Sequence, residues 1–307
     1  MTKVFIDGSA GTTGLRIYER LSARDDLNLI TLPDNLRKDT SARIDALNSA
    51  DIAFLCLPDT AAKEVANFDL NKNLVIIDTS TAHRTNPNWE YGLPELFGRR
   101  EKIKNSKRIA NPGCHASGFV ALVEPLIRHN LISDETTLTA LSITGYSGGG
   151  KQMIAAYESP DRPKSYNAPR QYALTQQHKH LKEMTEITGI KNAPVFCPIV
   201  ADFYSGMEVT VTLFKKDLKC TVDDIKNLYK HYYTTKFIHF DENADDDGFL
   251  SAQAYSGRDD MGISVFGNDD RILLTARFDN LGKGASGSAI QNMNIILDID
   301  ETTGLVL

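Results

Sequence analysis

One cysteine in a short turn carries the most chemical information in this chain. Asn111-Pro112-Gly113-Cys114-His115 leads directly into an apolar, helix-like run that ends at Ile127. Pro112 cannot continue a strand and Gly113 can adopt dihedrals closed to other residues, so we expect the Cys114 thiol near the first turn of that helix. Unpaired N–H groups and the helix dipole there favour a reactive thiolate. Taken alone, the residue is equally compatible with a buried structural thiol.

A cysteine nucleophile needs a group that holds and returns its proton, and histidine suits this role because its pKa lies near working pH. Of the seven histidines, His178 and His180 stand out at the start of a predicted helix, residues 178–188. Residues two apart on a helix point about 200° apart, so we expect at most one of them to face Cys114. A solvated surface pair is the alternative. His115, adjacent to the cysteine, is not expected to fold back onto it.

Three glycines, Gly8, Gly11 and Gly14, lie between an apolar strand and a helical segment. In that context glycines let the backbone approach a pyrophosphate, whose charge is stabilised at the helix N-terminus. The spacing differs from the usual G-x-G-x-x-G, so a tight turn without a ligand is the alternative. The predicted cofactor contacts of this loop are Gly8, Ser9, Gly11, Thr12, Thr13 and Gly14.

The choice between NAD and NADP depends on the end of the second predicted strand, where an acid would hold the ribose 2′-hydroxyl of NAD. Asp34 lies near that place, but Arg37 and Lys38 follow closely. Basic side chains suit a 2′-phosphate and favour NADP. Two solvated loop charges are the alternative.

A second glycine cluster, residues 146–151, ends a predicted strand and opens a helix. Its backbone N–H groups can form an anion-binding nest, and basic side chains in the polar stretch that follows are candidate clamps for a carboxylate or phosphate. A flexible turn and solvated charges are the alternatives. The residues concerned are Ser147, Gly148, Gly149, Lys151, Arg162, Lys164 and Arg170.

The order of the predicted elements indicates how these residues are positioned. Short apolar strands alternate with helices up to residue 78, which indicates a parallel sheet covered on both faces. Beyond Cys114 fewer helices separate the strands, which indicates a mixed α+β domain, with a loop at residues 164–174. The predicted strands are 3–7, 27–32, 52–57, 74–78, 136–145, 207–214 and 271–279, and the predicted helices are 15–21, 41–49, 60–67, 178–188, 221–232 and 286–296.

Length and composition limit the class of protein. The chain has 307 residues, ample for two domains, and a net charge of −6 that argues against a general nucleic-acid binder. No run approaches the roughly 20 apolar residues that cross a bilayer, and the immediate start of a strand leaves no room for a signal peptide. The four cysteines lack metal-site spacing and a disulfide pattern, so we expect a reducing cytoplasm.

Several segments together resemble the N-acetyl-γ-glutamyl-phosphate reductases, NADPH-dependent enzymes of arginine biosynthesis. The glycine loop and the short length are similar to the compact second type of this family. The matching segments run in the expected order along nearly the whole chain: Asp7–Leu15, Tyr91–Leu96, Asn111–Cys114, His178-x-His180-x-x-Glu183 and Asp279–Ala285.

The resemblance implies a Rossmann-type parallel sheet domain, residues 1–114 with 286–307, and a mixed α+β domain, residues 115–285, for catalysis and contacts within a homo-oligomer. It implies that Cys114 displaces phosphate from a small acyl-phosphate substrate and forms a thioester that NADPH reduces to an aldehyde. His180, in preference to His178, would be the acid/base, with Glu183 behind it. The implied cofactor contacts are Leu57, Pro58, Ser80 and Asn280, with Lys283 and Gly284 beside the nicotinamide; the predicted substrate contacts are Asn111, Lys151, Arg170 and Lys283.

The chain departs from the family pattern at two positions. The longer type usually has tyrosine after the cysteine, where this chain has His115, and the usual proline before the helix glutamate is Lys182. Aspartate-semialdehyde dehydrogenase is the nearest alternative, since it shares the fold and the thioester chemistry. A nucleotide-sensing Rossmann protein without catalysis and a cysteine hydrolase are further alternatives.

Overall fold

The computed structural model describes residues 1–307, which divide into two units. The first unit contains Met1–Gly113 and Ala285–Leu305, and the second contains Cys114–Gly284 and Val306–Leu307. None of the helices is long and apolar enough to cross a membrane.

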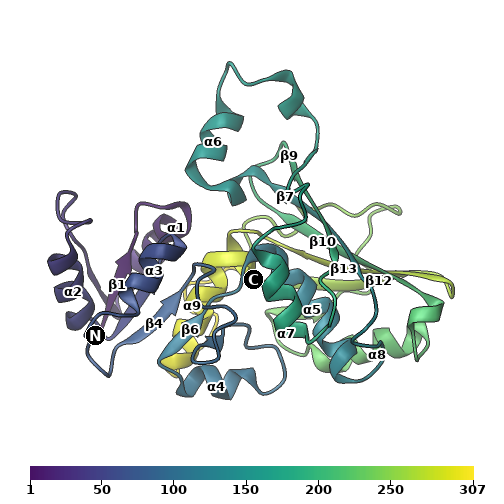
Figure 1. Ribbon diagram of the computed structural model, residues 1–307, viewed down its shortest axis with the longest axis horizontal. Helices are drawn as coiled ribbons and strands as arrows, with labels where there is room; N and C mark the ends of the chain where they lie inside the picture. Colours follow the sequence, from purple (N-terminus) through teal and green to yellow (C-terminus); the bar gives the residue numbers. More distant parts are fainter. The chain divides into compact units, whose positions relative to one another are not determined.

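A six-stranded parallel sheet with the order β2-β1-β3-β4-β6-β5 forms the centre of the first unit (Figure 1). Every neighbouring pair of strands is parallel, so all six end at the same edge. The strand order reverses beside β1, and ligands of such sheets bind at that point, outside the carboxyl ends of the strands. The strands are β1 (Thr2–Asp7), β2 (Leu27–Ile30), β3 (Ile52–Leu55), β4 (Val75–Asp78), β5 (Glu90–Tyr91) and β6 (Arg108–Ala110).

Helices cover both faces of this sheet because successive side chains of a strand point to opposite sides. Val4 of β1 packs with Ile17 and Met293 on one face, and Phe5 packs with Leu47 on the other. The predicted parallel sheet with two covered faces is confirmed. The helices are α1 (Thr12–Ser22), α2 (Thr40–Ser49), α3 (Asp59–Val65), α4 (Arg99–Asn105) and, from the end of the chain, α9 (Gly287–Ile296).

The second unit contains a seven-stranded mixed sheet with the order β11-β12-β13-β10-β7-β9-β8. The pairs β7/β9 and β11/β12 are parallel and the other four are antiparallel, which confirms the predicted mixed α+β character. The strands are β7 (Thr139–Gly145), β8 (Arg170–Gln171), β9 (Val195–Ala201), β10 (Met207–Phe214), β11 (Ile238–Phe240), β12 (Met261–Gly267) and β13 (Arg271–Phe278), and the helices are α5 (Cys114–Arg128), α6 (Gly150–Glu158), α7 (His180–Thr188) and α8 (Val222–Tyr232).

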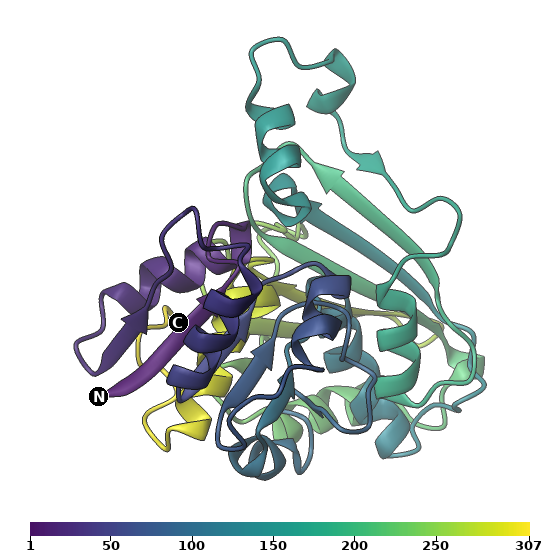
Figure 2. The same cartoon turned by 60° about the vertical axis from the view of Figure 1, so that its left-hand side comes forward.

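Helix α5 lies directly on this sheet. A Cβ added to Gly118 would come within 2.7 Å of a Val209 methyl group on β10, so the missing side chain allows a close approach. Helices α7 and α8 pack beside α5. The segment between β7 and β8, with α6, extends beyond the end of the sheet (Figure 2).

The structure corrects the prediction of an unstructured loop over residues 164–174. Lys164–Asn167 forms a 3-10 turn, and Arg170 and Gln171 pair with Val200 and Ile199 as the edge strand β8. Two residues are too few for a periodic signal, so pairing with a neighbour decides their conformation. The partner strand β9 was itself not predicted, because Pro198 in its middle argues against a strand.

Two tyrosines of the second unit stabilise α5 at an internal proline. Pro125 has no N–H, so the carbonyl of Ala121, four residues earlier, loses its helical donor. The Tyr233 hydroxyl donates to that carbonyl at 2.7 Å, and the Tyr229 hydroxyl donates to the carbonyl of Leu122. Both bonds are buried and connect α8 to the helix that begins at Cys114.

We expect Tyr233→Phe to lower the free energy of unfolding by about 1–3 kcal/mol, since it leaves a buried carbonyl without a donor. Urea unfolding followed by circular dichroism measures the change. Tyr204→Phe, at a tyrosine that is 46% exposed, is the matched control and should change little. Equal midpoints for Tyr233→Phe and the wild type would contradict this role.

Candidate active site

The glycine loop of the first unit connects β1 to α1 as a tight turn. Gly8 has φ +89°, and a Cβ there would overlap the carbonyl oxygen of Cys56 at the end of β3. A Cβ on Gly14 would overlap the carbonyl oxygen of Gly8, so α1 lies directly against the turn. These contacts explain Gly8 and Gly14 by backbone packing and leave the first turn of α1 close to the strand ends.

The first turn of α1 has the donors that a phosphate requires. No side chain caps the helix at Gly11. The Thr12 hydroxyl is buried and has no hydrogen-bond partner within the protein. Uncapped N–H groups and an unsatisfied hydroxyl at a helix N-terminus fit the pyrophosphate of a dinucleotide.

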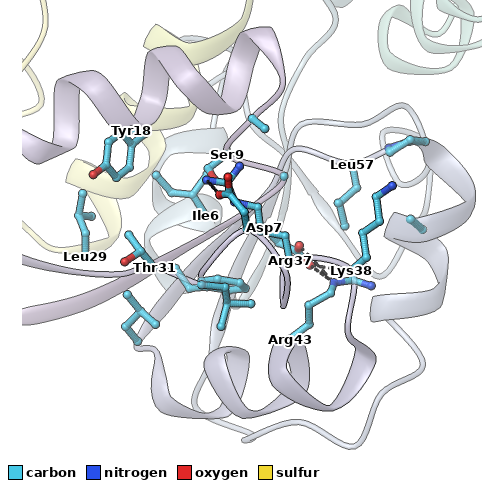
Figure 3. A pocket seen from close by; sticks show the side chains of 18 residues that line it. Ile6, Asp7, Ser9, Tyr18, Leu29, Thr31, Arg37, Lys38, Arg43 and Leu57 are labelled. Atoms are coloured by element: carbon cyan, nitrogen blue, oxygen red, sulfur yellow. Dashed lines mark hydrogen bonds and ion pairs between the residues drawn. The ribbon is translucent and has the colours of Figure 1, made fainter.

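A cavity of about 640 Å³ opens beside this loop (Figure 3). At its wall the Arg43 guanidinium donates to the Asp7 carboxylate, with Nη2 2.8 Å from Oδ2, and both side chains are buried. Burial raises the pKa of Asp7, while the bond and the charge of Arg43 oppose the rise. Predicted contacts that line the cavity are Gly8, Ser9, Arg37, Lys38, Leu57 and Pro58.

The charged groups of the cavity differ in how they are paired. Arg43 is held by Asp7, and Arg37 lies 2.8 Å from the Asp34 carboxylate. Lys38 has no ion pair and is the cation available to an incoming anion. The sequence analysis did not identify Arg43. A buried aspartate at the end of β1 was the available signal, because such a carboxylate requires a cation.

Ser80 lies at the end of β4, outside the cavity lining. Its N–H and its hydroxyl both donate to the Asp78 carboxylate at 2.8 Å. The same carboxylate lies 2.6 Å from Nδ1 of His83, whose ring stacks on Trp89. Asp78 therefore fixes the turn in which Ser80 lies.

Asn111 is also engaged within the first unit. Its amide donates to the carbonyl of Ala285 at 2.9 Å and accepts from Asn292 at 3.3 Å, and the side chain is 1% exposed.

In the second unit, Cys114 is the first residue of α5, in agreement with its predicted place at a helix start. The turn Gly282–Ser286 packs against it, since a Cβ on Gly284 would lie 3.0 Å from the Cβ of Cys114. Cys56 provides a contrast, because burial raises the pKa of that thiol to about 12. Only Cys114 combines partial exposure with a helix N-terminus.

The two predicted histidines converge, and the expectation that they point apart is wrong. Helix α7 begins at His180, so His178 precedes it and the 100° step of a helix does not separate them. Their ring centroids are 4.7 Å apart, and both lie within 6 Å of the His115 ring, at 5.9 and 5.5 Å. Burial lowers the pKa of His178, and the nearby charge of Lys179 adds to this. Glu183 follows in the first turn of α7 and is buried.

His115 is a residue that the sequence analysis passed over. Its two ring nitrogens each lie 2.7 Å from a hydroxyl oxygen, Nδ1 from Ser142 and Nε2 from Tyr172. Burial, followed by the charge of His178, lowers its pKa to about 3, so the ring is neutral at working pH. The departure from the family pattern therefore occupies a defined position beside Cys114.

The second glycine cluster holds itself together. The Asn280 amide donates to the Ser147 hydroxyl at 3.0 Å and accepts from the N–H of Gly206 at 2.9 Å. A Cβ on Gly148 would lie 3.2 Å from that amide, and one on Gly149 would press on Met153.

The predicted substrate cations lie in different settings. Lys151 is exposed in the first turn of α6. The Arg170 guanidinium lies 3.5 Å from the Tyr166 ring centroid and donates to the Tyr157 hydroxyl at 2.8 Å. Lys283 is fully buried, with Nζ 5.1 Å from the Phe237 ring centroid.

A buried carboxylate supports the turn that carries Lys283. Asp279 accepts from the N–H groups of Leu281 and Gly282, and also from the Ser205 hydroxyl and the N–H of Gly257. Four donors to one carboxylate stabilise its charge and hold Gly282–Ser286 against Cys114.

Both units match models of one protein family. Residues 3–106 match the semialdehyde dehydrogenase NAD-binding domain, and residues 114–280 match the semialdehyde dehydrogenase dimerisation domain. A curated N-acetyl-gamma-glutamyl-phosphate reductase 2 of Nostoc sp. is 42% identical, with 99% of each chain covered. The N-acetyl-gamma-glutamyl-phosphate reductase of Rhizobium etli is 43% identical, covering 96% of this chain and 98% of the relative. The chain belongs to the N-acetyl-γ-glutamyl-phosphate reductase family.

Solved structures place this reductase-family chain within a wider fold group. Aspartate semialdehyde dehydrogenase II from Vibrio cholerae has a TM-score of 0.72 and 17% identity, covering 97% of this chain and 99% of that chain. The enzyme from Candida albicans, solved with NADP, has a TM-score of 0.68 and 14% identity, with 97% and 99% covered. At these identities the likeness establishes the fold alone.

We expect Lys38→Ala to weaken NADP binding by about ten- to a hundredfold and to leave NAD binding unchanged, because a charge-assisted bond to the 2′-phosphate is lost. Titration calorimetry with each dinucleotide measures both affinities. Arg37→Ala should have the smaller effect, since Arg37 is paired with Asp34. Lys63→Ala on α3, outside the cavity lining, is the control. Equal losses for NAD and NADP would contradict a 2′-phosphate site.

Proposed function

We propose that the protein reduces N-acetyl-γ-glutamyl phosphate to N-acetylglutamate 5-semialdehyde and phosphate with NADPH, a step of arginine biosynthesis. The observation that carries this proposal is Cys114 at the first residue of α5, next to a cluster of buried histidines, in a chain that is 42% identical to such a reductase over 99% of its length. A helix N-terminus favours the thiolate that the reaction needs.

The chemistry of Cys114 follows from nucleophilic catalysis. The sulfur attacks the acyl carbon, the bond from that carbon to the phosphate oxygen breaks, and phosphate leaves with its electron pair. NADPH, when bound, supplies the hydride that reduces the acyl carbon of the resulting thioester. The carbon–sulfur bond of the thiohemiacetal then breaks, so the aldehyde is released and Cys114 is again a thiolate.

We assign the acid/base role to His180. It opens α7, it is 5% exposed, and Glu183 lies one turn further on the same helix. The imidazole takes the thiol proton before the attack, gives it to the oxygen of the thiohemiacetal, and recovers it as the carbonyl forms. His178 donates no side-chain proton to the backbone here; its Nδ1 accepts from the N–H of His180 at 3.2 Å and fixes the start of the helix.

We assign the cofactor and substrate contacts by the same chemistry. The first turn of α1 and Lys38 would hold the phosphates, and Leu57 and Pro58 the wall beside them. Lys151 and Arg170 are the proposed contacts to the anionic substrate, with Lys283 beside Cys114. Asn111 and Asn280 contribute by fixing backbone, because their amides are already bonded.

The second sheet offers an interface for a second copy of the chain. Its rows Leu273–Thr212–Thr139–Val195 and Thr275–Thr210–Leu141–Cys197 point away from the face that carries α5. Leu141, Val195 and Leu273 are 36%, 50% and 40% exposed. Exposed apolar side chains on neighbouring strands are typical of interfaces, and these residues lie in the segment that matches the dimerisation domain. We therefore propose a homo-oligomer, active in the cytoplasm, where the four free thiols would stay reduced.

We expect Cys114→Ala to abolish phosphate-dependent NADPH formation from N-acetylglutamate semialdehyde and NADP, with a loss of at least about a thousandfold. NADPH absorbance follows the reaction in this reverse direction. Cys220→Ala is the matched control, because burial raises the pKa of that thiol and it takes no part in the chemistry. An undiminished rate in Cys114→Ala, or a rate independent of phosphate, would refute the proposal.

We expect Leu141→Lys combined with Val195→Lys to reduce the solution mass to that of one chain, since two buried charges would oppose the interface. Sedimentation equilibrium measures the mass. Phe249→Lys is the control, because Phe249 is 76% exposed and lies outside the sheet. An unchanged oligomer in the double variant would show that copies associate elsewhere.

A further inference from the structure

A buried chain of three polar side chains lies beside the nucleophile and has no part in the mechanism above. It runs from the Ser142 hydroxyl through the His115 ring to the Tyr172 hydroxyl, with 2.7 Å at each link. Ser142 is 0% and His115 is 3% exposed. His115 follows Cys114 directly in the first turn of α5.

The sheet sets the length of this chain. Ser142 on β7 is paired with Pro198 on β9, and on the other side the N–H of Tyr172 donates to the carbonyl of Pro198 at 3.0 Å. Ser142 and Tyr172 thus lie in one row, two strands apart, with their side chains on the same face, a separation of about 9.6 Å between backbones. The His115 ring bridges them above Pro198.

A neutral imidazole has one N–H and one lone pair, so it can donate to only one of the two hydroxyls. If Nδ1 carries the proton, Tyr172 must donate to Nε2. If Nε2 carries it, the Ser142 hydroxyl donates to Nδ1, and the Tyr172 oxygen accepts from His115. In that second arrangement the Tyr172 proton is free to point elsewhere, and no charge is buried.

The electrostatics around Tyr172 show where that proton can go. Burial raises the pKa of the Tyr172 phenol, and the negative charge of Cys114 raises it further. The phenol therefore keeps its proton, and the thiolate lies within reach of its field. The ionisable groups on the elements packed around this site are His178, Lys179, His180, Glu183 and Lys283.

We propose that Tyr172 donates a hydrogen bond to the sulfur of Cys114, and that Ser142 and His115 orient this donor as positioning residues. The hydroxyl stabilises the thiolate before the attack and again when the aldehyde leaves. The proposal rests on the proposed function in one respect: it takes Cys114 as the nucleophile.

The test measures the thiolate directly, in the full-length protein without substrate. Cys114 is alkylated with iodoacetamide across a range of pH, and mass spectrometry of its peptide gives the rate. Loss of one charge-assisted hydrogen bond in Tyr172→Phe should raise the pKa of Cys114 by about one unit and lower the rate at neutral pH about tenfold. The neighbouring histidines and Glu183 are common to both proteins, so the difference isolates the hydroxyl.

Tyr232→Phe is the matched control. Its hydroxyl donates to Glu124 at the far end of α5, so the change removes the same atom from the same helix environment. It should leave the alkylation profile unchanged. Circular dichroism confirms that each variant is folded. An unchanged profile in Tyr172→Phe, or an equal shift in Tyr232→Phe, overturns the inference.

The orienting role of His115 is tested by a double-mutant cycle. His115→Phe should raise the pKa of Cys114 by less than Tyr172→Phe does, and the double variant should match Tyr172→Phe alone, because His115 acts through the tyrosine. Additive shifts would overturn the relay. The reductase assay of Cys114→Ala is separate: a normal Tyr172 effect with no reductase activity refutes only the proposed function, and reductase activity with no Tyr172 effect refutes only this inference.

Discussion

The seating of α5 on the second sheet is the constraint on which the candidate nucleophile depends. Gly118 allows the helix to approach Val209 closely, and the hydroxyls of Tyr229 and Tyr233 replace the hydrogen bond that Pro125 removes. A helix with an uncompensated proline would bend at that point. Since Cys114 is the first residue of α5, its position depends on bonds made more than one turn away.

Buried charge is managed differently in the two units. In the first unit, Asp7 is paired with Arg43, and in the second, Asp279 accepts four hydrogen bonds. Around Cys114 the polar groups are mainly neutral, because burial keeps His115 unprotonated and Tyr172 protonated. A thiolate in such surroundings depends on dipoles and hydrogen bonds, which do not change with pH over the working range.

The sequence predicted what depends on local pattern. The strands of the first sheet, the helix start at Cys114 and the glycine turn follow from periodicity and from residues such as Gly8, whose φ is +89°. It failed where contacts far apart in sequence decide the conformation. Strand β9 contains Pro198, β8 has two residues, and the convergence of His178 with His180 depends on where α7 begins. The Asp7–Arg43 pair spans 36 residues and has no local signal.

The residue after the cysteine illustrates why a family pattern needs the structure to be understood. A tyrosine at that position, usual in the longer type, would present one hydroxyl at the end of a ring. His115 instead presents two nitrogens on opposite sides of a smaller ring, and the structure has a hydroxyl at each. An imidazole can exchange which side donates without becoming charged, whereas a phenol has one polar atom. The substitution therefore adds a connection between β7 and Tyr172 that a tyrosine would not make in the same way, and it does so at the first turn of the helix that carries Cys114.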